Sequence, residues 1–212
     1  MIIAIDGPAA AGKGTLARRL AAHFGLAFLD TGSLYRAVGA KILRTKQDPR
    51  DVVAAQGAAE NLSSDDLTAP ELRTEAVSEA ASIVAAQPAV RAALLEFQRN
   101  FARRPPGGET GAVLDGRDIG TVVCPEPDVI KFFVHASLAA RARRRFKELQ
   151  ARGDSVTEAR VQQDMDERDK RDMSRGIAAL KPASDAYDLD TTGLNPDQVF
   201  QAALHHIQRT RA

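Results

Sequence analysis

Two patterns of apolar residues alternate along the chain. Short runs rich in β-branched or aromatic residues predict strands at 2–5, 26–29, 112–115, 129–134 and 187–191. Apolar positions at helical spacing predict helices at 16–24, from 33, near 50–60, at 71–86, 88–103 and 137–151, in a charged stretch after 155, and from 195. A short linker is expected just before 71. Strands that alternate with helices indicate an α/β fold, a five-stranded parallel sheet with helices on both faces.

The first predicted strand runs directly into a glycine-rich loop and then into a helix. Gly7 to Lys13 fit the pattern G-x-x-x-x-G-K, which in this context binds phosphate. Successive backbone N–H groups and the helix N-terminus attract an anion, and the lysine adds a positive charge. An ordinary glycine-rich turn is the alternative. The predicted loop consists of Gly7, Pro8, Ala9, Ala10, Ala11, Gly12, Lys13, Gly14 and Thr15.

The end of this loop departs from the commonest form of the motif. Gly14 separates Lys13 from the hydroxyl of Thr15, whereas the usual magnesium-binding hydroxyl follows the lysine directly. The Gly-Lys-Gly-Thr order resembles the loop of nucleoside monophosphate kinases. We therefore expect Mg²⁺ to bind phosphate oxygens, waters and a carboxylate elsewhere in the chain.

Length and composition limit the classes of protein. A chain of 212 residues suits one α/β domain with appendages. A net charge of +1 and 5% aromatic residues favour neither a basic groove nor stacking platforms for nucleic acid. The single Cys124 suits a reducing compartment, and the apolar start is too short for a signal peptide or a membrane span. We expect a cytoplasmic protein that binds neither nucleic acid nor membrane.

Polar side chains follow the predicted strand at 112–115. Ligands of open α/β sheets gather at the carboxyl ends of strands, so Asp115, Arg117 and Asp118 are candidate ligand-binding residues. Asp115 is the candidate carboxylate for Mg²⁺, acting through water, although a helix cap or turn is the alternative. Arg36 lies in the first turn of its predicted helix, where the helix dipole does not favour a cation. We expect Arg36 to have another partner, with a solvated side chain as the alternative.

A highly charged helix is predicted around 167–175. Helical spacing places Arg168, Arg171, Asp172 and Arg175 within an arc of roughly 100°. Clustered guanidinium groups suit the strongly anionic group that moves in phosphoryl transfer. The alternative is a solvated helix with pairs such as Asp164–Arg168 or Arg168–Asp172. The basic residues at 141–145 are interpreted as a mostly solvated face, from which one arginine could stack on a base.

Together the motifs resemble the bacterial cytidylate kinase family. The matching segments are IDGPAAAGKGT (5–15), LDTGSLYR (29–36), ELRTEAVSEAASIVA with PAVRAALL (71–95), LDGRDIGTVV (114–123) and ERDKRDMSR (167–175). The resemblance implies transfer of the ATP γ-phosphoryl group to CMP or dCMP with Mg²⁺, on a P-loop NTPase-type core. It also implies a core at 1–36, 104–150 and 177–212, a monophosphate-binding region at 37–103 and a lid at 151–176.

The resemblance also implies a role for each matching residue. Lys13 and the loop would bind the ATP phosphates, and Arg171 would stabilise the transferred group. The acceptor phosphate would be bound by Arg36, Arg117 and Arg175, the cytosine by Ser82, Arg91 and Asp118, and the ribose by Arg168 and Asp172. A carboxylate accepts from the N4 amine of cytosine, which uracil lacks. The catalytic residues would be Lys13, Arg171 and Arg175.

One segment departs from the family pattern. Better-known members carry a long, strand-rich insertion before the segment that corresponds to 71–86. Here the matching stretch, 63–69, is too short for a three-stranded sheet, so a mainly helical region is expected. Alternatives to a cytidylate kinase are another small-acceptor kinase (adenylate, shikimate or dephospho-coenzyme A kinase), a nucleotide-binding regulator and an RNA-associated ATPase. A monomer is the expected state.

Overall fold

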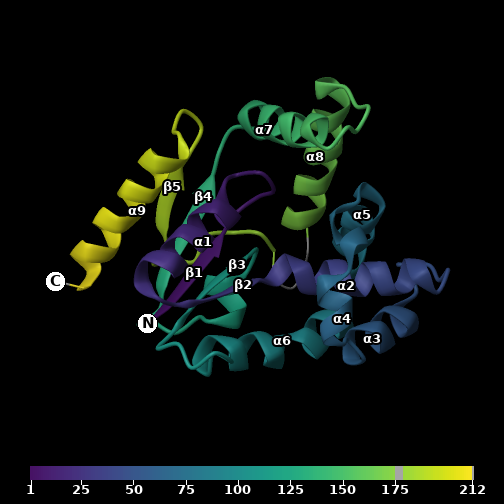
Figure 1. Cartoon of the computed structure of the whole chain (residues 1–212), viewed down its shortest axis with the longest axis horizontal. Coiled ribbons are helices and arrows are strands. Elements are labelled where there is room, and N and C mark those ends of the chain that lie inside the picture. The colour runs from purple at the N-terminus through teal and green to yellow at the C-terminus, as the bar shows by residue number, and fades with distance from the viewer. Residues whose placement is uncertain (175–178, 212) are drawn as a thin grey trace. The chain divides into compact units, whose positions relative to one another are not determined.

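The computed structural model describes residues 1–174 and 179–211, and it divides into two compact units (Figure 1). Unit 1 comprises Met1–Leu29 with Ala102–Ala212, and unit 2 comprises Asp30–Phe101. Both termini of the chain belong to unit 1. Each unit has its own hydrophobic core.

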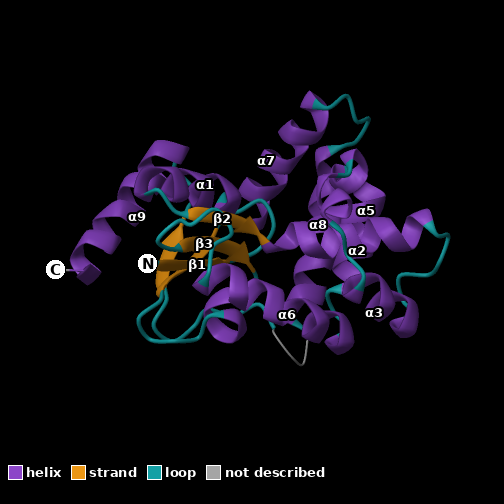
Figure 2. Ribbon diagram, turned by 60° about the horizontal axis from the view of Figure 1, so that its bottom comes forward, coloured by secondary structure: helices purple, strands orange, loops and turns teal. Residues whose placement is uncertain are grey.

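Unit 1 contains the sheet, drawn in orange in Figure 2. Its strands are β1 (Ile2–Asp6), β2 (Ala27–Asp30), β3 (Ala112–Gly116), β4 (Ile130–His135) and β5 (Tyr187–Asp190), in the order β2-β3-β1-β4-β5. β1 pairs in parallel with β3 and β4, and β4 pairs in parallel with β5. All five predicted strands and the α/β fold class are therefore confirmed. The register places Asp6 level with Gly116, so the loops that follow β1 and β3 begin at the same edge.

The helices of unit 1 position these loops. α1 (Lys13–Phe24) and α9 (Pro196–Arg211) pack with the central strands in one core, in which Ile3, Ile5 and Leu20 are fully buried. A π-helical turn, η2 (Ile119–Val123), follows β3. α7 (Leu138–Ala151) and α8 (Glu158–Met173) form a separate apolar cluster with loop residues Ala9 and Ala10.

Unit 2 is built of helices, as its sequence predicts. They are α2 (Thr31–Arg44), α3 (Val52–Glu60), α4 (Ser64–Thr68), the 3₁₀-helix η1 (Pro70–Arg73), α5 (Glu75–Val84) and α6 (Pro88–Arg103), whose last two residues lie in unit 1. Val38, Ile42, Val84 and Val90 are fully buried between them. Among the described residues no single helix is long and apolar enough to cross a membrane; only α5 and α6 taken together, bent by 97°, reach that length and composition.

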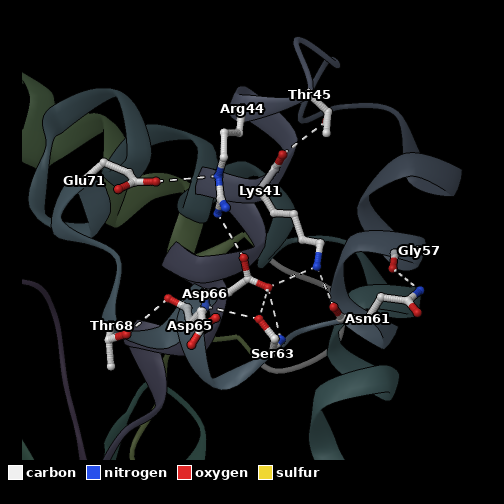
Figure 3. Close-up of polar contacts among 10 residues, drawn as sticks. All are labelled: Lys41, Arg44, Thr45, Gly57, Asn61, Ser63, Asp65, Asp66, Thr68 and Glu71. Carbon is white, nitrogen blue, oxygen red and sulfur yellow. Dashed lines mark hydrogen bonds and ion pairs between the residues drawn. The ribbon is translucent and has the colours of Figure 1, made fainter.

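The linker prediction before 71 was wrong, because this stretch folds into α4 (Figure 3). Ser63 and Asp66 form a reciprocal capping box at its start. The buried Asp66 carboxylate also pairs with Lys41 and Arg44 of α2, at 3.0 Å each. A helix of five residues is not stable alone. Here the ion pairs with α2 stabilise it, and the sequence pattern did not reveal these pairs.

Candidate active site

The loop after β1 has a backbone that only glycine allows at one point. Gly7 has φ +146°, and a Cβ there would lie 1.9 Å from the carbonyl oxygen of Val134. At the other end, Gly12 is the N-cap residue of α1 and has no side chain to bond the first helical N–H groups. Those N–H groups stay available to an anion.

Three side chains bind carbonyl groups of the same loop. Lys13 Nζ donates to Pro8 O at 2.9 Å, Arg141 Nη1 donates to Ala9 O at 3.3 Å, and Thr191 Oγ1 donates to Ala11 O at 2.9 Å. Because these carbonyl oxygens are directed to donors of the protein, the loop is held in one conformation.

Asp115 lies against the start of α1. Its Oδ1 is 3.8 Å from Lys13 Nζ, and a Cβ on Gly14 would lie 3.1 Å from its Oδ2. Within the described part of the chain, no group of three or more His, Cys, Asp or Glu side chains could hold a metal ion. Mg²⁺ is commonly bound through one or two carboxylates together with substrate phosphates. Asp115 therefore fits a site in which Mg²⁺ is bound by the phosphates of a nucleotide and by this one carboxylate.

The loop after β3 and the helix α8 are joined by an ion pair. Arg117 Nε donates to Asp172 Oδ2 at 2.9 Å, and Asp172 is only 2% exposed. Burial opposes the charge of Arg117, but Asp172 outweighs it, and the pKa of Arg117 is raised. Asp118, next along the loop, is buried as well. The fold thus brings together Arg117 and Asp172, which are 55 residues apart in the chain.

The other predicted residues of α8 differ in exposure. Arg168 is half-buried, Arg171 is exposed, and Arg175 lies outside the described residues. The carboxylate of Asp164 pairs with Arg160 at 3.0 Å. The helix therefore combines surface pairs with buried carboxylates, and Asp164 and Asp172 pair with Arg160 and Arg117 respectively.

The prediction that residues 141–145 form a mostly solvated face was wrong for Arg141, which is 5% exposed. Its guanidinium binds Asp169 through two bonds, of 3.2 and 2.6 Å, and its Nε donates to Ala136 O at 2.9 Å. The signal was available, since Arg141 falls on the apolar stripe of α7 with Leu138 and Leu149. Its partner on α8 could not be inferred from spacing.

In unit 2, the predicted polar residues have distinct surroundings. Arg36 was expected to have a partner other than solvent, and its Nη2 donates to Asp30 Oδ2 at 2.6 Å. Arg91 lies over the ring of Tyr35, 5.5 Å from its centroid, and donates to Ala85 O at 3.1 Å. Ser82 is 4% exposed, and its Oγ has no hydrogen-bond partner among residues 1–174 and 179–211. A buried hydroxyl without a partner is uncommon and costs about 1–3 kcal/mol.

Over residues 3–209 the sequence matches the family model described as cytidylate kinase. The chain belongs to the cytidylate kinase family. It is similar to the cytidylate kinase of Paramagnetospirillum magneticum, with 62% identity over 210 residues that cover 99% of each protein. It is also similar to the cytidylate kinase of Rhodospirillum rubrum, with 54% identity over 214 residues that cover 99% of this chain and 100% of the relative.

Membership in the cytidylate kinase family makes the chain a phosphotransferase. It favours a cytidylate kinase over the alternative functions that the sequence left open. A regulator or an RNA-associated ATPase, and a kinase of adenylate, shikimate or dephospho-coenzyme A, are all less consistent with a match of this length.

Solved structures agree with the fold. An uncharacterised protein from Eubacterium ventriosum superimposes with a TM-score of 0.56 at 14% identity, over 98% of both chains. A sugar kinase from Janibacter sp. superimposes with a TM-score of 0.50 at 16% identity, over 98% of this chain and 94% of its own. At this identity the likeness concerns the fold of the cytidylate kinase chain and not its substrate.

Sequence reasoning missed one buried carboxylate next to the glycine-rich loop. Asp6, the last residue of β1, is 4% exposed and accepts hydrogen bonds from the backbone N–H groups of Ile119 and Gly120, at 2.7 Å each. Burial raises its pKa to about 7, although the two N–H donors and Lys13 act in the opposite direction. An aspartate at the end of a fully apolar strand was the signal in the sequence.

Proposed function

We propose that the chain transfers the γ-phosphoryl group of ATP to CMP or dCMP, and that its residues divide this task as follows. The N–H groups of the loop Gly7–Thr15 and the ammonium group of Lys13 bind the ATP phosphates. Support comes from the φ of Gly7, the bare N-cap at Gly12 and the buried position of Lys13 beside the loop. When bound, Mg²⁺ neutralises phosphate charge, and Asp115 is the carboxylate that would hold it through water.

The acceptor is held by a second set of residues. We assign its phosphate to Arg36, Arg117 and Arg175, its cytosine to Ser82, Arg91 and Asp118, and its ribose to Arg168 and Asp172. The partnerless Oγ of Ser82 supports this assignment, because a bound base would supply the missing hydrogen bond. Arg36 and Arg117 are each held by a carboxylate, Asp30 and Asp172 respectively, which restricts their rotamers before a ligand arrives.

The chemical step is a displacement at phosphorus. An oxygen of the acceptor phosphate forms a bond to the γ-phosphorus, the bond from that phosphorus to the β–γ bridging oxygen breaks, and ADP leaves with that electron pair. No general base is needed, because the acceptor phosphate is anionic near neutral pH. The protein therefore acts by positioning and by neutralising charge, with Lys13, Arg171 and Arg175 as the catalytic residues.

The family match over residues 3–209 carries this proposal. A coupled assay of ADP release tests it, with CMP, dCMP, UMP, AMP and shikimate as acceptors. We expect turnover with CMP or dCMP well above that with the others. Equal rates with AMP and CMP would refute the cytosine assignment, and no turnover with any acceptor would refute the kinase.

The remaining parts of the proposal concern organisation. We propose a core at 1–36, 104–150 and 177–212, a monophosphate-binding region at 37–103, and a lid at 151–176 that excludes water during transfer. The enzyme would act as a cytoplasmic monomer without nucleic acid or membrane, in keeping with its net charge of +1. Light scattering tests the monomer, and loss of turnover in EDTA with recovery in Mg²⁺ tests the metal.

A further inference from the structure

One carboxylate connects the strand that carries the phosphate loop to the loop that carries Arg117 and Asp118. Asp6 ends β1, directly before Gly7. Its Oδ1 accepts from Ile119 N and its Oδ2 accepts from Gly120 N, each at 2.7 Å. These are the first two N–H groups of η2, which begins immediately after Asp118.

The two bonds replace a cap that η2 lacks. Asp118 is its N-cap residue, but the Asp118 side chain makes no capping hydrogen bond. The first N–H groups of a helix have no partner within it, and here a side chain from a different strand accepts both of them. Bonds of this length from N–H to a carboxyl group are strongly directional, and they are charge-assisted when Asp6 is ionised.

We propose that Asp6 is a positioning residue for acceptor recognition: it fixes the backbone after Asp118, and through it the side chains of Arg117 and Asp118, relative to the end of β1. This inference rests on the proposed assignment of Arg117 and Asp118 to the acceptor. Asp6 itself is buried, and we assign it no contact with either substrate. The Asp6 carboxylate bonds the loop after β3, which carries the proposed CMP-binding residues. Removing this carboxylate should therefore weaken CMP binding more than ATP binding.

The surroundings leave little freedom for another arrangement. A Cβ on Gly120 would lie 3.4 Å from Asp6 Oδ2 and 3.2 Å from Cδ of the buried Lys131. Gly120 therefore lets the backbone approach the carboxylate closely. An asparagine at position 6 offers one acceptor oxygen and an NH₂ group, so it satisfies one of the two N–H groups and opposes the other.

The test compares Asp6→Asn with Gly120→Ala, which leaves Asp6 in place and adds a methyl group 3.4 Å from its Oδ2 and 3.2 Å from Cδ of Lys131. Asp185→Asn is the matched control, because it also removes a charge that holds a buried partner, Lys131 at 2.7 Å, and it lies outside the proposed binding residues. For each variant, KM for CMP and KM for ATP are measured by coupled ADP release, and the melting temperature by calorimetry. Wild-type enzyme is assayed first.

We expect Asp6→Asn to raise KM for CMP about tenfold or more, as loss of one charge-assisted hydrogen bond implies, with KM for ATP within about twofold. Gly120→Ala should raise KM for CMP by a smaller factor, and it decides the matter if Asp6→Asn does not fold. Asp185→Asn should lower the melting temperature without changing either KM. A larger rise in KM for ATP, or a lower melting temperature with both constants unchanged, would overturn the inference. Wild-type enzyme without CMP turnover would instead refute the proposed function.

Discussion

The buried pair between α7 and α8 allows a quantitative prediction. Arg141 and Asp169 are 5% and 7% exposed and share two hydrogen bonds. The change Asp169→Leu leaves the guanidinium buried with only carbonyl acceptors, and Arg141→Met leaves the carboxylate buried. Removing one partner of a buried ion pair costs about 3–5 kcal/mol of stability.

The double variant separates the energy of the Arg141–Asp169 interaction from the energies of the other contacts of these two residues. With both charges gone, no uncompensated ion remains, and the chief loss is the donor to the buried Ala136 carbonyl, worth about 1–3 kcal/mol. The double variant should therefore be more stable than either single variant. The cycle should give a coupling energy of about 3 kcal/mol or more between Arg141 and Asp169.

The assay is urea unfolding followed by circular dichroism, with equal m-values required across the four proteins. Single-variant losses that add within about 0.5 kcal/mol would refute the argument, because they would mean that the charges do not depend on each other. Turnover supplies a second readout. Every variant with Arg141→Met should have a raised KM for ATP, since Arg141 also bonds Ala9 O of the phosphate loop.

Three further predictions concern single side chains. Lys13→Ala should lower turnover by about 100-fold or more in a protein that still folds, and turnover at the wild-type rate would exclude its role. Asp118→Ala should reduce the preference for CMP over UMP by about 1–3 kcal/mol in kcat/KM, and unchanged selectivity would remove Asp118 from base recognition. Asp66→Asn should lower the free energy of unfolding by about 1–3 kcal/mol. Its hydrogen bonds to Ser63 and its ion pairs hold the pKa of Asp66 below its usual range. The difference from wild type is therefore complete above the unfolded pKa of about 4, shrinks as the pH falls below that value, and is lost only as the pH passes through the lower folded pKa. Acid-titrated urea melts check this, and a difference that grows toward low pH would contradict it.

Local patterns in the sequence were sufficient to predict most of the elements and to single out the glycine-rich loop. The loop motif depends on consecutive residues, because a strand, a glycine-rich turn and a helix start form one continuous piece of backbone. The five strands and the helices other than α4 were likewise found from apolar periodicity, which reports burial directly. The resemblance to a kinase family required only the order of such segments, and the full-length match agrees with it.

Contacts between segments far apart in the chain were decided by the tertiary structure. The pairing of Arg117 with Asp172, of Arg141 with Asp169, and of Asp66 with Lys41 and Arg44 spans 22 to 55 residues. No spacing rule selects such partners, because each charge has many possible counterparts until the fold excludes water from some of them. The sequence by itself thus determined the strands, most of the helices and the loop that we propose binds phosphate. Only the packed structure determined which charges are buried, and a buried charge must be paired whereas a solvated one need not be.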